Sequence, residues 1–293
     1  MTRTTMDHET TISSLAGLYR LFTENKDTEN SAKVRQLIEK AEAKEVQLAF
    51  CGHFSAGKST MINHLVGKKI LPSSPIPTSA NVVKVKSGKE AIKVFFFDGT
   101  YMEFEGAYDL KEIKAFCKEG DIKEIHIMSE HFPLADDCAV IDTPGIDSTD
   151  DAHRVSTQST LHLADIIVYV MDYNHVQSQE NFLFVRKMAE MGKRLYLIVN
   201  MIDKHDSAEL AFADFKASVS HAFSQWNIEP EGIFYTSLRD FSMPENQIKQ
   251  VQHFIQERIE FERSRLPEPI REASLRLAED HATINEERLG DET

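Results

Sequence analysis

The chain has 293 residues, of which 41% are hydrophobic and 27% are charged, a composition that excludes a disordered protein and supplies enough apolar residues for a sizeable core. This length fits either one domain with helical additions or two domains. The formal net charge of -14 excludes a general electrostatic attraction to nucleic acid or to anionic lipid, because both are polyanions.

The N-terminus, the cysteines and the apolar runs indicate a cytoplasmic chain. Residues 1–11 carry charges and no apolar run, so we expect no signal peptide. Cys51, Cys117 and Cys138 lack metal-site spacing, and we expect free thiols, buried where they fall in apolar runs. The longest apolar runs are far shorter than the ~20 residues of a membrane-spanning helix. Any membrane contact must come from elsewhere.

In chain order, two amphipathic helices precede the core, because apolar residues recur at helical spacing in residues 12–22 and 34–41. Short apolar strands then alternate with helical patterns, the order typical of a doubly wound α/β sheet. The expected strands are residues 46–51, 82–86, 93–97, 138–141, 166–171, 195–200 and 233–236, with helices at 180–191 and 208–226.

The ends of this pattern add an edge strand and a helical bundle. The pair Asp98-Gly99 predicts a hairpin with residues 100–104, and therefore an antiparallel edge on a mostly parallel sheet. After Pro244 an amphipathic helix runs to residues 266–269, where Pro267 and Pro269 force a break or hinge. The apolar stripe of the following helix would pack with the N-terminal helices in a bundle. We therefore expect helices in residues 1–45, an α/β domain in 46–240 and helices in 241–293.

The first motif in the chain is a phosphate-binding loop in residues 52–59. The pattern G-x-x-x-x-G-K-[ST] lies between an apolar strand and a helix that begins at Thr60. Backbone N–H groups of this loop and of the helix N-terminus would hold phosphates, with Lys58 on the outer two and the Ser59 hydroxyl on Mg²⁺. The expected nucleotide-binding residues here are Gly52, His53, Phe54, Ser55, Ala56, Gly57, Lys58, Ser59 and Thr60.

A second motif, Asp142-Thr143-Pro144-Gly145, follows an apolar strand. A carboxylate at a strand end can reach the metal, so Asp142 is a predicted Mg²⁺ ligand. The absence of a side chain at Gly145 would let its N–H approach the terminal phosphate. Together the two motifs predict a P-loop nucleoside triphosphatase.

Base choice depends on Asn200-Met201-Ile202-Asp203, at the end of another apolar strand. An Asp203 carboxylate would accept hydrogen bonds from the ring N–H and the amine of guanine, whereas adenine presents a lone pair there. Lysine is usual at the position of Met201, whose thioether stem can still lie across the base. The remaining predicted base contacts are Lys204, Thr236, Ser237 and Leu238.

The sequence alone does not identify the group that activates the attacking water. Thr78, in a proline-rich loop after the phosphate-loop helix, is expected to close over Mg²⁺ as a switch. Ile146 stands where Ras-like enzymes place a water-orienting glutamine. Ser55 could orient the water or complete a site for Na⁺ or K⁺. The expected catalytic residues are Ser55, Lys58, Thr78 and Gly145.

With these motifs and the proline-broken C-terminal helix, the chain resembles the GTPase head of a bacterial dynamin-like protein. The resemblance covers residues 46–236 and is most specific in the run Ser55-Ala56-Gly57-Lys58-Ser59. It implies Mg²⁺-dependent GTP hydrolysis, head-to-head homodimers, neck helices on either side of the head, and membrane remodelling or fusion at the cytoplasmic face. Phe54 and Met201 depart from the glutamine and lysine of eukaryotic dynamins.

Two other functions fit the same motifs. One is a slow GTP-regulated module that acts by binding partner proteins, which the missing catalytic glutamine permits. The other is an RNA-associated GTPase of the Era type, which the net charge of -14 disfavours, so no nucleic-acid partner is expected.

Overall fold

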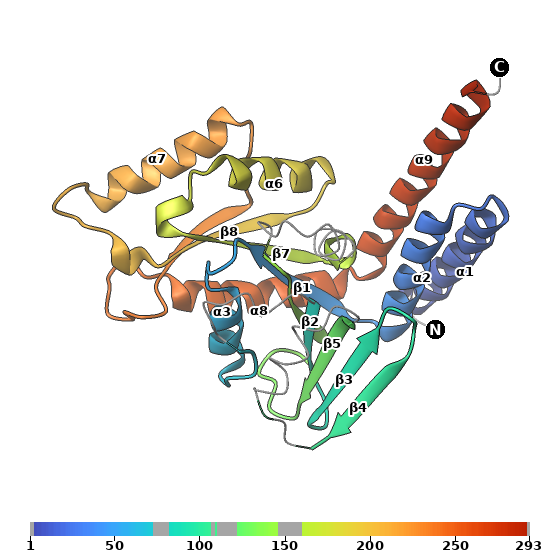
Figure 1. Ribbon diagram of the computed structural model, residues 1–293, viewed down its shortest axis with the longest axis horizontal. Coiled ribbons are helices and arrows are strands. Elements are labelled where there is room, and N and C mark those ends of the chain that lie inside the picture. Colours follow the sequence, from blue (N-terminus) through green and yellow to red (C-terminus); the bar gives the residue numbers. More distant parts are fainter. Residues whose placement is uncertain (1–2, 73–81, 107–108, 110–121, 146–159, 292–293) are drawn as a thin grey trace. The chain divides into compact units, whose positions relative to one another are not determined.

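The computed structural model describes residues 3–72, 82–106, 109, 122–145 and 160–291 (Figure 1). The chain divides into two compact units, one formed by Gln47–Ile259 and the other by Met1–Val46 with Glu260–Thr293. Cys51 and Cys138 are buried free thiols, as expected, and Cys117 lies outside the described residues. No helix in the described ranges is long and apolar enough to cross a membrane.

A nine-stranded mixed sheet forms the centre of the larger unit, in the order β4-β3-β5-β2-β6-β1-β7-β8-β9. Its strands are β1 (Val46–Gly52), β2 (Val82–Ser87), β3 (Ala91–Phe96), β4 (Tyr101–Glu105), β5 (Ile122–Ser129), β6 (Cys138–Asp142), β7 (Ile166–Asp172), β8 (Leu195–Asn200) and β9 (Gly232–Thr236). The described helices are α1 (Arg3–Glu24), α2 (Thr28–Ala43), α3 (Lys58–Val66), α6 (Gln179–Glu190), α7 (Phe212–Gln225), α8 (Ile248–Ser264) and α9 (Pro267–Asp291), with short 3-10 helices η1 (Tyr173–His175) and η2 (Ile202–Lys204).

Strand pairing confirms the α/β class with an antiparallel edge. Successive parallel pairs join β1 to β7, β7 to β8 and β8 to β9. At the outer edge of the sheet, β3 pairs antiparallel with β4. The sequence analysis missed β5, which pairs antiparallel with β3 and parallel with β2. β2 in turn is antiparallel to β6. The hairpin therefore joins the sheet through β5 rather than directly through β2.

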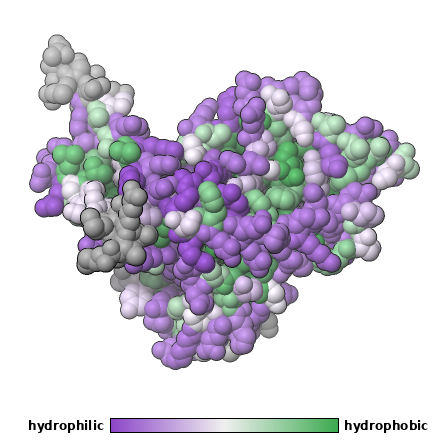
Figure 2. Space-filling view, turned by 180° about the vertical axis from the view of Figure 1, so that it is seen from behind, coloured by the Kyte–Doolittle hydropathy of each residue, from purple (hydrophilic) through white to green (hydrophobic). Residues whose placement is uncertain are grey.

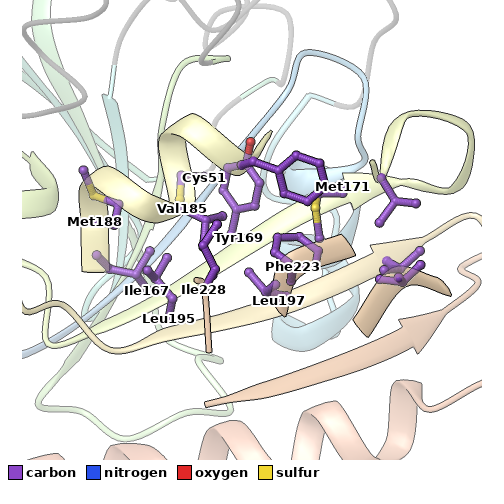
Figure 3. Packing of buried hydrophobic residues seen from close by; sticks show 14 of the residues in the cluster. Cys51, Ile167, Tyr169, Met171, Val185, Met188, Leu195, Leu197, Phe223 and Ile228 are labelled. Carbon is purple, nitrogen blue, oxygen red and sulfur yellow. The ribbon is translucent and has the colours of Figure 1, made fainter. Parts of the chain in front are cut away.

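Helices α6 and α7 cover one face of the sheet, around the buried Tyr169 of β7 (Figure 3). The Tyr169 hydroxyl donates to Asn181 Oδ1 at 2.7 Å, and its ring stacks on Phe184 at a centroid distance of 4.8 Å. This bond satisfies two buried polar groups within an otherwise apolar layer, so neither carries the cost of an unpaired group.

Helix α8 covers the opposite face of the sheet. The Phe254 ring lies 4.5 Å from that of Tyr196 on β8 and 5.0 Å from that of Phe234 on β9. Side chains of successive strand residues point to opposite faces, so Tyr196 meets α8 while its neighbour Leu197 joins the α6–α7 layer. The face of the molecule in Figure 2 is mostly hydrophilic, with separate hydrophobic patches.

The smaller unit contains α1, α2 and α9 packed around apolar side chains. Its buried core includes Leu15, Phe22, Val34, Leu37, Ala41, Ile270 and Leu277. Asp27 caps α2 by accepting from Asn30 N at 3.1 Å, and it also bonds to His281 of α9 at 2.6 Å. Along the chain, α8 ends at Ser264 and α9 begins at Pro267, where a proline is tolerated because the first helical N–H has no partner within the helix.

Candidate nucleotide-binding site

The turn from β1 to α3 carries the phosphate-binding loop, and its glycines are required by their positive φ and by close contacts with neighbouring atoms. A Cβ on Gly52 (φ +141°) would lie 2.0 Å from Val170 O. A Cβ on Gly57 (φ +97°) would lie 2.5 Å from Asn200 Nδ2. Both positions therefore exclude any side chain, and the loop backbone can approach a ligand closely.

Lys58 is buried within this loop, with 7% of its surface exposed. Its ammonium donates to the carbonyl oxygens of Gly52 and His53, both at 2.9 Å. The charge is thus held where the loop closes, and phosphate oxygens could replace the carbonyls as acceptors. His53, Phe54, Ser55 and Ala56 form the turn itself, in which Ser55 has a φ of +63°. Thr60 lies in the first turn of α3, which begins at Lys58.

Two of the predicted metal ligands, Ser59 and Asp142, lie together. The Ser59 hydroxyl donates to Asp142 Oδ2 at 2.5 Å, although the two residues are 83 positions apart. Asp142 is 2% exposed, and its Oδ1 has no hydrogen-bond partner among the described residues. Burial raises the pKa of this carboxyl, and the charge of Lys58 and the Ser59 hydrogen bond offset burial only in part.

This donor set fits Mg²⁺. The ion prefers oxygen ligands, is commonly held by one or two carboxylates with water and phosphate, and would satisfy the unpaired Asp142 oxygen. Thr143 fixes the end of β6 beside β1, because its N–H and its hydroxyl each donate to Phe50 O at 3.1 Å. Gly145 follows at the end of the described segment, and Thr78 lies outside the described residues.

The predicted base-contacting residues come together at the ends of β8 and β9. Asn200 Nδ2 donates to Ala56 O at 2.9 Å, and Asn200 Oδ1 accepts from the Thr236 hydroxyl at 3.2 Å. The Ser237 hydroxyl donates to Asp203 Oδ1 at 2.6 Å. These bonds link the base loop, residues 200–204, to the phosphate-binding loop and to the loop after β9.

Met201 and Lys204 flank Asp203 in the base loop. The Met201 backbone is left-handed (φ +64°), and its methyl carbon lies 3.9 Å from the position of a Cβ on Gly57. Lys204 Nζ is 3.8 Å from Asp172 Oδ1 at the end of β7. Leu238 follows Ser237 in the loop after β9.

Sequence reasoning missed Asn246, which holds the loop after β9. Its Oδ1 accepts from Ser237 N at 3.2 Å, while its Nδ2 donates to the carbonyls of Ser237 and Asp240, both at 2.8 Å. The signal available in the sequence was an asparagine two residues before an amphipathic helix, which is typical of a cap or turn and does not reveal its partners.

The described residues that the sequence predicts to bind phosphate, metal and base all lie at the carboxyl ends of the central strands. A phosphate-binding loop, a metal-binding carboxylate at a strand end and an Asn-x-x-Asp base loop define the class of P-loop GTPases.

Comparisons with known proteins identify the family. The model of the Dynamin family matches residues 48–203, and the chain belongs to that family. It is 42% identical over 232 residues to Dynamin-like protein A of Bacillus subtilis, covering 79% of this chain and 19% of that protein. It is 25% identical over 198 residues to Dynamin-like protein 1 of Campylobacter jejuni, covering 54% of this chain and 27% of that protein.

A solved structure supports the fold. It is described as an oligomerised bacterial dynamin pair that provides a mechanism for the long-range sensing and tethering of membranes, and it matches with a TM-score of 0.57 and 16% identity. The match covers 100% of this chain and 57% of that one. The chain thus spans less than two thirds of the length of each of these relatives.

Proposed function

We propose that this chain is the GTPase head of a bacterial dynamin-like protein, which binds GTP with Mg²⁺ and hydrolyses it. The observation that carries the proposal is the pairing of Ser59 with the buried Asp142, whose second oxygen has no partner among the described residues. This pair and the Asp203–Ser237 pair both lie at the carboxyl ends of the central strands, so one nucleotide could contact both.

Each described residue then has a role. Lys58 exchanges its two carbonyl partners for phosphate oxygens, and the N–H groups at the start of α3 add to the same phosphates. Ser59 and Asp142 would hold Mg²⁺, and the bound ion would neutralise charge on the phosphates. Asp203 accepts from the guanine ring N–H and amine, and Ser237 keeps its carboxylate oriented.

We also propose roles for the groups nearest the attacking water. The backbone N–H of Gly145 would approach the terminal phosphate, and Thr78, which lies outside the described residues, would close over Mg²⁺. Ser55, held in a left-handed conformation, orients the water or supplies a ligand for Na⁺ or K⁺.

We further propose that hydrolysis is stimulated when two heads pair, and that the flanking helices transmit this contact as the neck of a longer protein acting at the cytoplasmic face of a membrane. Support comes from the likeness to Dynamin-like protein A and to the oligomerised bacterial dynamin pair. In this arrangement residues 1–45 and the C-terminal helical segment that follows the head form the neck, with its hinge at 266–269, while residues 241–259, which group with the sheet, belong to the head.

The test is the GTP hydrolysis rate per head, measured as protein concentration rises at fixed saturating GTP and Mg²⁺. Pairing predicts a rate per head that increases with concentration and then levels off. A rate per head that stays constant, with heads that remain monomeric in the presence of a transition-state mimic, would contradict stimulation by pairing while leaving GTP binding intact.

A slow GTP-regulated binding module is the second candidate, and Phe54 favours it. Phe54 occupies the loop position at which eukaryotic dynamins carry a water-positioning glutamine, and a phenyl ring cannot hydrogen-bond to water as an amide does. A concentration-independent turnover together with nucleotide-dependent capture of a partner would favour this module.

A further inference from the structure

The base loop is anchored at both of its ends. At the start, Asn200 bonds to Ala56 and Thr236, as described above. At the other end His205 follows η2, and its backbone N–H donates to Ile202 O at 3.0 Å. The His205 ring extends this anchor, because Nδ1 forms a 2.8 Å hydrogen bond with the Tyr173 hydroxyl.

Aromatic side chains hold the His205 ring in place. Its centroid lies 5.0 Å from Phe212 in an edge-on arrangement and 5.7 Å from Phe215, both on α7. Tyr173 packs on Phe215 at 4.6 Å. The His205 Nε2 atom is buried, and in the described part of the chain the Tyr173 hydroxyl is the hydrogen-bond partner of this ring.

Tyr173, the partner of His205 in this hydrogen bond, is held in place by the sheet. Tyr173 directly follows Asp172, the last residue of β7, which pairs in register with Asn200 of β8. Tyr235 belongs to the same aromatic group, with its ring 5.6 Å from that of Phe212. Since Tyr235 directly precedes Thr236 and Ser237, the aromatic group contacts both of the segments that would hold the base.

The base loop needs such support, because Met201 adopts a left-handed backbone that a residue with a side chain disfavours. A conformation of this kind persists only where its surroundings fix it from more than one direction. Asp203 lies between Met201 and His205, so the position of its carboxylate depends on both anchors.

We propose that His205 is a positioning residue for base recognition. Its hydrogen bond to Tyr173 holds Asp203 where the carboxylate can accept from the exocyclic amine of guanine, and thereby sets the preference of the site for guanine over a purine that lacks this amine. This inference rests on the proposed function, because it needs a guanine nucleotide at Asp203.

The test compares the affinities of GDP and inosine diphosphate, since hypoxanthine keeps the ring N–H but lacks the amine. Tyr173→Phe removes one hydroxyl and keeps the ring, and His205→Phe keeps the ring contacts and removes the nitrogen atoms. We expect each variant to lower the GDP-to-IDP affinity ratio about fivefold, the effect of one hydrogen bond. The double variant should lower the ratio no further than either single variant, because both remove the same bond.

Tyr101→Phe is the matched control. Tyr101 is exposed on β4, at the opposite edge of the sheet from β8 and β9, and this variant should keep the parental ratio. A ratio unchanged in both test variants overturns the inference, as does an equal loss of affinity for both nucleotides, which would indicate a role in stability only. If the parent chain does not prefer GDP to ADP, the proposed function fails first and this inference with it.

Discussion

Two aspartates of this protein are almost equally buried and yet differ in their hydrogen bonding. Asp142, in the nucleotide site, is 2% exposed, and Asp27, in the helical unit, is 6% exposed. Asp27 accepts from Asn30 N, Asn30 Nδ2 and His281 Nδ1, so both of its oxygens are bonded. Asp142 accepts only from Ser59 among the described residues and keeps one oxygen without a partner.

The two carboxyl pKa values shift in opposite directions, because Asp142 lies deeper below the surface and also accepts fewer hydrogen bonds than Asp27. Burial raises the pKa of Asp27, but the hydrogen bonds from His281 and Asn30 outweigh burial and leave the pKa below its usual range. At Asp142 burial outweighs the charge of Lys58 and the Ser59 bond, and the pKa is raised. A satisfied buried carboxylate stabilises the fold, whereas an unsatisfied one indicates a ligand that completes it.

The largest expected effect is that of Lys58→Ala on nucleotide binding. Losing two charge-assisted bonds to phosphate should weaken guanine nucleotide binding by about 100-fold or more, with little change in the folded structure. Titration with a fluorescent GDP analogue measures this loss. Lys69→Ala, which removes an exposed lysine from the same unit, should bind as the parent does. Parental affinity in Lys58→Ala would show that residues 52–59 do not hold the phosphates.

Asp203→Asn should exchange base preference. An amide donates where the carboxylate accepted, so the variant should favour xanthine over guanine nucleotides by about 10²-fold relative to the parent. Competition between XDP and GDP for the labelled nucleotide gives this ratio. Unchanged selectivity would remove Asp203 from the base site.

Asp27→Ala should destabilise the helical unit by about 2–3 kcal/mol, because it removes the cap of α2 and leaves buried His281 and Asn30 without their acceptor. The chain has one tryptophan, Trp226, which stacks on Phe182 in the larger unit. Denaturation followed by circular dichroism should therefore shift, while the Trp226 fluorescence transition should shift less. Asp280→Ala, an exposed change on α9, is the control. Coincident, unshifted transitions would contradict a structural role for Asp27.

Asp142→Asn should weaken ligand binding without lowering stability, the opposite of what we expect for Asp27→Ala. The nucleotide-free variant should be at least as stable as the parent, because the change removes a buried charge without altering shape. Its affinity for GDP in the presence of Mg²⁺ should fall about tenfold, while affinity in the presence of a chelator changes little. A variant that is destabilised but binds Mg²⁺ and GDP normally would make Asp142 a structural residue like Asp27.

Acid should affect the helical unit in the direction that the Asp27 pKa dictates. The pKa is lowered in the folded state, so its contribution to stability is full above the unfolded value of about 3.9 and is lost as the pH falls through the folded value. The free energy of unfolding measured by circular dichroism should therefore drop below about pH 4 more in the parent than in Asp27→Asn. An equal drop in both would exclude Asp27 as the titrating group.

Local patterns were sufficient to predict the strands that carry the site. The phosphate-binding loop, Asp142 and Asp203 each follow a continuous apolar run, and the carboxyl ends of parallel strands lie at one edge, so their proximity follows from the pattern. β5 was missed because its apolar alternation is short, and two successive polar residues, Lys123 and Glu124, separate Ile122 from the alternating Ile125 and Ile127. The strand also joins the sheet between β3 and β2, an order that no local pattern specifies.

Contacts between distant residues could not be predicted. Nothing near Asp27 indicates that His281, 254 positions later, is its partner, and nothing near His205 indicates Tyr173. By residue type alone, the aromatic residues that support the base loop cannot be distinguished from other aromatic residues of the core. Only the fold shows that they contact the segments bearing Asp203 and Ser237.

Calorimetric titration of the parent chain with GDP and with ADP, each in the presence of Mg²⁺, tests the account most directly. We expect one site per chain for GDP and binding to ADP that is weaker by orders of magnitude, because Asp203 matches the hydrogen-bond donors of guanine alone. The absence of heat for GDP, or equal affinity for the two nucleotides, would contradict the account.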